Sequence, residues 1–140
     1  MREYIEGVIT PEEASNLSNT VGYLDFTDAR LGGVLDIIKG FVDVRLWKPS
    51  YVRVEENRLG HPWHIDQGNT GHMTWCDYSA SVLLSHPSKF DGGGFYFFGD
   101  EEPTYHYCDL LLYDSHPNNR HCVKRNSGGR KVLLMFFSSL

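Results

Sequence analysis

A histidine and an aspartate two residues apart, His64 and Asp66, stand in the segment GHPWHID, residues 60–66. On extended backbone, residues i and i+2 project from the same face, so both side chains can reach one metal ion. Two imidazoles and one carboxylate on one face of an octahedral ion suit non-haem Fe(II), which keeps its other positions open. A later segment, NRHCVKRNSGGRK at 119–131, offers another histidine, His121, with basic residues after it.

The His-x-Asp pair alone is weak evidence for a metal site. With seven histidines and ten aspartates among 140 residues, chance alone gives about 0.5 such pairs in the chain. His64 can equally be a half-buried histidine bonded to the backbone, and Asp66 a turn residue before Gly68. The rest of the chain must therefore decide whether the two residues belong to a metal site.

Helix signals are confined to the first forty residues. The segment TPEE places Thr10 as a helix N-cap, Pro11 at the first helical position and Glu13 three residues after the cap. This is a capping box with the favoured proline, so it predicts a helix that begins near residue 11. A second helix is predicted within 27–42, where apolar residues recur at helical spacing and two adjacent glycines weaken the pattern.

From about residue 50 onward, aromatic and β-branched runs alternate with turn residues, which is typical of short antiparallel strands. We expect a mainly β fold, a sandwich or jelly-roll barrel with the helices packed outside. No repeat or linker divides the chain, so we expect one domain over 1–140, with supporting helices in 1–45 and the jelly-roll core in 46–140. Strands are expected near 50–56, 74–85, 94–98, 104–113, 121–125 and 130–138.

Composition argues against several classes of partner. The net charge of −5 without a long basic run argues against nucleic acid. The longest apolar run near the C-terminus, Val132–Phe137, spans six residues, far below the roughly 20 that cross a bilayer as a helix. Three cysteines are an odd set, and no secretory segment precedes them, so we expect a reducing, cytoplasmic setting. Nothing in the sequence indicates an oligomeric state.

The order of the remaining motifs is more specific than any one of them. After His-x-Asp come an apolar strand, the segment FDGGGFYFF (90–98), a second apolar strand that ends in a tyrosine, and then His121 with basic residues after a pair of glycines. This order resembles the iron(II) and 2-oxoglutarate-dependent dioxygenases, in particular the prolyl and lysyl hydroxylase branch. The resemblance covers about residues 60–137. It implies a double-stranded β-helix, which is a jelly-roll barrel, with paired glycines as a structural corner.

The resemblance implies that His64, Asp66 and His121 are the iron ligands. His116 competes with His121 for the distal position. In the family a basic residue follows the distal histidine by ten positions, and ten residues after His116 stands Asn126, which cannot pair with a carboxylate. We therefore expect His116 to be a surface turn residue.

The same count from His121 reaches Lys131, which the resemblance makes the partner of the far carboxylate of 2-oxoglutarate. Its neighbour Arg130 is the alternative, because adjacent strand residues face opposite sides and only one can point into the barrel. Arginine is the better bidentate partner for a carboxylate, whereas lysine acts as a point charge. The family count favours Lys131.

Aromatic residues near the site are harder to assign, because most aromatics belong to a core. Tyr51 is the nearest match to the tyrosine that often helps to hold 2-oxoglutarate in the family, but it lies further upstream than usual. Trp63, Trp75 and Tyr78 are candidate substrate contacts.

The function implied by the resemblance is hydroxylation of a C–H bond coupled to decarboxylation of 2-oxoglutarate to succinate. Fe(II), 2-oxoglutarate and O2 are the expected cofactors and co-substrates, with ascorbate as a further candidate. A peptidyl proline is the first substrate to expect, and a free amino acid or other small molecule is the alternative. A jelly-roll protein that binds a metal such as zinc without oxygenase activity, or an interaction module without metal, fits the sequence as well.

Overall fold

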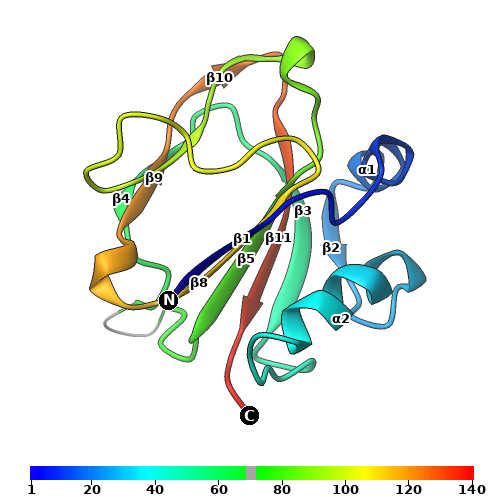
Figure 1. The fold of residues 1–140 in the computed structure, drawn as a ribbon, viewed down its shortest axis with the longest axis vertical. Helices are drawn as coiled ribbons and strands as arrows, with labels where there is room; N and C mark the ends of the chain where they lie inside the picture. The colour runs from blue at the N-terminus through cyan, green and yellow to red at the C-terminus, as the bar shows by residue number, and fades with distance from the viewer. Residues whose placement is uncertain (69–71) are drawn as a thin grey trace.

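The computed structural model describes residues 1–68 and 72–140. Its centre is a six-stranded antiparallel sheet in the order β1-β8-β5-β11-β3-β2, and a three-stranded sheet in the order β4-β9-β7 lies across from it (Figure 1). A short pair, β10 and β6, completes the barrel at one end. The fold is therefore mainly β and a jelly roll, as expected. The strands are β1 (Arg2–Ile5), β2 (Gly22–Leu24), β3 (Tyr51–Glu56), β4 (His61–His64), β5 (Tyr78–Leu83), β6 (Asp91–Gly92), β7 (Phe95–Phe97), β8 (Leu110–Asp114), β9 (His121–Val123), β10 (Asn126–Ser127) and β11 (Lys131–Phe137).

Two α-helices cover the outer face of the large sheet (Figure 1). Helix α1 (Pro11–Ser18) begins where predicted, and Thr10 and Glu13 form both hydrogen bonds of the capping box. Helix α2 (Gly32–Lys39) is shorter than the predicted 27–42, because a 3-10 turn (Ala29–Leu31) precedes it and the two glycines form its first turn. Among the described residues, no helix has the length and apolar character needed to cross a membrane.

Strand alternation divides the apolar residues of the large sheet between two cores. Residues such as Val54, Val82 and Leu133 face the helices and form the outer core with α1 and α2. Their strand neighbours, such as Leu83 and Val132, face the small sheet and form an aromatic-rich inner core. The long central strand β11 sets this alternation, because Leu133 pairs with Val82 of β5 on one side and Val54 of β3 on the other. The inner face is therefore the wall on which a site inside the barrel is built.

Several strands differ from the sequence-based expectation. The strand expected at 104–113 begins only at Leu110, because Cys108 has a φ of 66°, which no extended strand contains. The strand expected at 74–85 is confined to β5. The segment 1–45, expected to supply only helices, also provides β1 and β2 at the two edges of the large sheet. Strand β4 was not expected as a separate element.

Candidate metal centre

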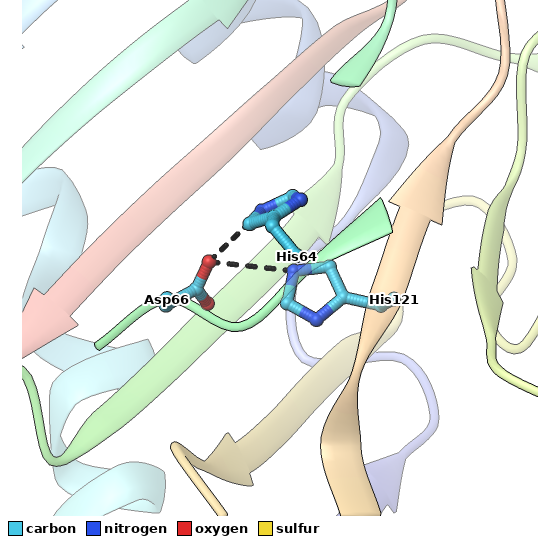
Figure 2. A group of neighbouring side chains, drawn as sticks. All are labelled: His64, Asp66 and His121. Carbon is cyan, nitrogen blue, oxygen red and sulfur yellow. Dashed lines mark ion pairs between the residues drawn. The ribbon is translucent and has the colours of Figure 1, made fainter. Parts of the chain in front are cut away.

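His64, Asp66 and His121 meet inside the barrel (Figure 2). The Oδ1 atom of Asp66 lies 3.2 Å from Nε2 of His64 and 3.3 Å from Nε2 of His121. The two histidines face each other because β4 and β9 pair at these residues. Extended backbone was expected for both His64 and Asp66. Strand β4 ends at His64, so only His64 lies on a strand, and Asp66 reaches the site from the bend that follows.

Both imidazoles are held with Nε2 directed at Asp66. Nδ1 of His64 donates to the carbonyl oxygen of Pro62 at 2.6 Å, and Nδ1 of His121 donates to that of Asn119 at 2.8 Å. Because Nδ1 carries the proton, a neutral ring presents the Nε2 lone pair to the site. Two lone pairs and a carboxylate oxygen facing one another need a positive charge between them. The donor set therefore fits a divalent metal such as Fe(II).

The ionised carboxylate of Asp66 is stabilised by the two histidines at Oδ1 and by Tyr113 at Oδ2. Burial raises the pKa of Asp66, but the hydrogen bonds that His121 and His64 donate to it when their Nε2 atoms carry a proton outweigh burial and keep that pKa well below its usual range. Tyr113 donates from its hydroxyl to Oδ2 of Asp66 at 2.7 Å. Burial, followed by the charge of Asp66, raises the pKa of Tyr113 well above its ordinary value. Tyr113 therefore remains a neutral donor that fixes the carboxylate, with Oδ1 facing the histidines.

The three residues open onto a cavity of about 370 Å³ between the two sheets. Arg130 lines the same cavity and is only 6% exposed. Its guanidinium donates to the hydroxyl of Tyr105, which also accepts from Oγ of Ser81 at 3.2 Å. Within residues 1–68 and 72–140, no carboxylate lies within ion-pair distance of Arg130. The cavity thus joins a metal-ligand set to a buried cation with room for an anion.

Lys131 faces the other way, so the prediction that it points into the barrel is wrong. Its Nζ donates to the carbonyl oxygen of Ser18 at the end of α1, 3.0 Å away on the outer face of the sheet. Val132 and Leu134 line the cavity together with Arg130, as alternation along β11 requires. The alternative, Arg130, is the basic residue of this segment that faces the site.

Tyr51 lines the cavity from β3, and its hydroxyl contacts Sδ of Met73 at 3.6 Å. Its face of the strand also carries Arg53 and Glu55, which the sequence analysis did not single out. Glu55 accepts from Arg53 at 2.7 Å and contacts Nε2 of His61 at the same distance. Alternation from Tyr51 could have revealed Arg53 and Glu55, because residues i, i+2 and i+4 share a face.

The other aromatic candidates lie outside the cavity lining. Trp63 is 42% exposed and packs edge-on against Phe98, with ring centroids 5.5 Å apart. Trp75 packs against Tyr51, which does line the cavity, at 5.8 Å. Tyr78 packs against the outer core beneath the helices, on the side of the sheet away from the cavity.

His116 is exposed and caps a 3-10 turn (Pro117–Asn119) before β9, and it is not part of the metal-ligand group. Tyr105 and Tyr113 are two tyrosines of the site that sequence reasoning missed. Tyr113 ends a strand that was expected, so its position could have been inferred. Tyr105 precedes β8 in irregular chain and carries no sequence signal.

Comparison with known proteins gives no family model and no curated protein that matches this chain. Solved structures do match over nearly its whole length. A prolyl-4-hydroxylase from Pseudomonas putida is 12% identical, with a TM-score of 0.73, and the match covers 99% of this chain and 92% of that one. The viral collagen prolyl hydroxylase of Paramecium Bursaria Chlorella virus-1, in its 2-oxoglutarate complex, is 12% identical with a TM-score of 0.67, covering 99% and 96%.

A prolyl hydroxylase from Trichoplax adhaerens, in complex with a peptide fragment of the hypoxia inducible factor oxygen degradation domain, also matches. It is 13% identical with a TM-score of 0.67, and the match covers 99% of this chain and 83% of that one. At these identities the comparison concerns the arrangement of the strands and helices. The chain therefore has the double-stranded β-helix fold found in prolyl hydroxylases.

Proposed function

We propose that this chain is an Fe(II)- and 2-oxoglutarate-dependent dioxygenase that hydroxylates a C–H bond, with a peptidyl proline as its substrate. His64, Asp66 and His121 would hold iron, and Arg130 would bind the far carboxylate of 2-oxoglutarate. The observation that carries the proposal is the buried guanidinium of Arg130, which shares a cavity with the metal-ligand group and has no carboxylate partner among the described residues.

An unpaired buried charge is costly, so a partner from outside the chain is expected for Arg130. A planar guanidinium forms two parallel hydrogen bonds to a carboxylate, a pairing that lysine cannot reproduce. Arg130 and the metal-ligand group line the same cavity, so a dicarboxylic acid bound there would have one end for each. Tyr105 holds the guanidinium in place by accepting its hydrogen bond, and Ser81 supports Tyr105 in turn.

The chain's own residues orient these groups and exclude water. Iron, 2-oxoglutarate and O2 would supply the oxidising chemistry when bound, with succinate, carbon dioxide and a hydroxylated substrate as the products. Phe95 stacks on the ring of His121 with centroids 4.6 Å apart, and Val132, Leu134 and Phe136 provide an apolar wall. We assign no side chain as a general base.

Two observations support a peptidyl proline. Neighbours in fold include enzymes named as prolyl hydroxylases, and one was solved with a peptide fragment. Tyr51 and Phe136, whose ring centroids lie 5.2 Å apart, give the cavity an aromatic wall, and such walls suit proline rings.

The three described cysteines are unpaired and buried, which supports a reducing compartment such as the cytoplasm.

The test is succinate formation from 2-oxoglutarate by Fe(II)-loaded protein under air, with ascorbate present to keep the iron reduced. Proline-containing peptides should stimulate succinate formation, whereas free proline should not. His121→Ala serves as the matched control and should be inactive. If only free amino acids stimulate succinate formation, the substrate is a small molecule and not a peptide. Iron-loaded, folded protein that consumes no 2-oxoglutarate would contradict the proposal.

A further inference from the structure

The histidine that we assign as the distal iron ligand is supported by the opposite end of the chain. The ring orientation of His121 depends on the carbonyl oxygen of Asn119, which accepts its Nδ1–H at 2.8 Å. Asn119 closes the 3-10 turn before β9 and is only 3% exposed. Whatever fixes the Asn119 peptide therefore also fixes the Nε2 atom that faces Asp66.

The Asn119 side chain forms hydrogen bonds with three residues. Its Nδ2 donates to Oδ1 of Asp114 at 2.7 Å, to the Asp114 carbonyl oxygen at 3.0 Å and to the Met1 carbonyl oxygen at 3.0 Å. Its Oδ1 accepts from Nε of Arg2 at 2.6 Å, and Arg2 also donates to the Asn118 carbonyl oxygen at 2.5 Å. Strand β1 pairs with β8, so the start of β1 lies beside this turn (Figure 1) and Arg2, which pairs with Tyr113, reaches Asn119.

Arg2 supports His121 by a second route through Phe97. The guanidinium carbon lies 3.7 Å from the centre of the Phe97 ring. Phe97 is 1% exposed and packs edge-on against His121, with centroids 6.1 Å apart and planes at 80°. Cation and ring attract each other in this geometry. Both the hydrogen-bond route and the packing route from Arg2 thus end at the same imidazole.

We propose that Arg2 and Asn119 are positioning residues for His121. Strand β1, through Arg2, would thereby hold the His121 ring in the orientation that binds the metal. The two histidines differ in this respect. His64 bonds to Pro62 within its own strand, whereas His121 depends on a contact between residues more than a hundred positions apart. Partners that orient ligand histidines commonly affect metal affinity about 10- to 100-fold. The inference rests on the proposed metal site and is independent of 2-oxoglutarate and of the substrate.

The test compares the Co(II) affinities of Arg2→Ala, Arg2→Lys and Asn119→Ala by visible absorption. Asn118→Ala is the matched control, because Asn118 is exposed and uses only its backbone in these hydrogen bonds. We expect Arg2→Ala and Asn119→Ala to weaken Co(II) binding about tenfold or more. Arg2→Lys keeps the cation near Phe97 but loses the paired hydrogen bonds, so its affinity should lie between those of Arg2→Ala and the wild type.

A second measurement separates positioning from a general loss of stability. In Zn(II)-loaded protein, the His121 Nδ1–H should exchange with water faster in Arg2→Ala than in wild type, while the His64 Nδ1–H should be unchanged. Equal Co(II) affinities and equal exchange at His121 in wild type and Arg2→Ala would overturn the inference, and so would equal changes at both histidines. Wild type that binds neither Co(II) nor Fe(II) would instead overturn the proposed metal site, so the two failures are distinguishable.

Discussion

Replacing Arg130 by methionine should remove most of the affinity for 2-oxoglutarate. Arg130 is 6% exposed and its cavity contains the metal-ligand group, so its pairing with a carboxylate would be largely shielded from water. Removing one partner of a buried, hydrogen-bonded charge pair costs about 2 to 5 kcal/mol. Since about 1.4 kcal/mol corresponds to a factor of ten, the dissociation constant should rise roughly thirtyfold to several thousandfold.

Lys131→Met is the matched control, because it removes the neighbouring cation by the same change. The Nζ atom of Lys131 bonds to Ser18 on the outer face of the sheet, so 2-oxoglutarate affinity should change less than about threefold, with a loss of stability of about 1 kcal/mol. Calorimetric titration of 2-oxoglutarate into anaerobic Mn(II)-loaded protein measures both variants. The opposite ranking, with Lys131→Met the damaging change, would refute the assignment of Arg130.

Three further predictions concern the metal-ligand group and its supports. Tyr113→Phe removes the donor to Oδ2 of Asp66 and should weaken Co(II) binding about tenfold, as measured by absorption; unchanged affinity would show that the hydroxyl is dispensable. Tyr105→Phe removes the acceptor of Arg130 and should weaken 2-oxoglutarate binding about three- to tenfold while leaving Co(II) affinity unchanged. Burial lowers the pKa of His64, but its bonds to Asp66 and Pro62 outweigh burial and raise the pKa above its ordinary 6.5. Because the neutral ring is the ligand, Co(II) affinity should rise by up to about tenfold per pH unit below that raised pKa and level off above it, and a flat profile between about pH 6 and about pH 8 would contradict this.

Local sequence signals predicted the parts of the fold that depend on neighbouring residues. Thr10 and Glu13 form the capping box because cap and backbone are three residues apart. The strands β3, β9 and β11 lie close to their expected positions, since their apolar runs are bounded by turn residues. The order of motifs also identified the three residues that the fold brings together at one point.

The orientation of Lys131 and Arg130 could not be read from local pattern. Alternation says that the two residues face opposite sides, but the direction is set by pairing with β3 and β5 far away in the sequence. Leu133 must reach the outer core beneath the helices, and this places Lys131 on the same face. The family count selected the member of the pair that faces the outer side of the sheet.

The contact between Arg2 and Asn119 was beyond sequence reasoning for a similar reason. Strand β1 is a four-residue edge strand, REYI, whose apolar pattern is too short to stand out. Its pairing with β8 is what brings Arg2 to the turn before His121. The pairing of strands far apart in the sequence therefore determines both which basic residue faces the cavity and which residues contact the turn before His121.

The most direct test of the account is optical titration of 2-oxoglutarate into anaerobic, Fe(II)-loaded protein. Joint binding of the metal by His64, Asp66 and His121 and of the far carboxylate by Arg130 predicts a visible metal-to-ligand charge-transfer band. The band should saturate with one 2-oxoglutarate per chain, disappear in His121→Ala, and require far higher concentrations in Arg130→Met than in Lys131→Met. Folded, iron-loaded protein that develops no such band would contradict the central claim.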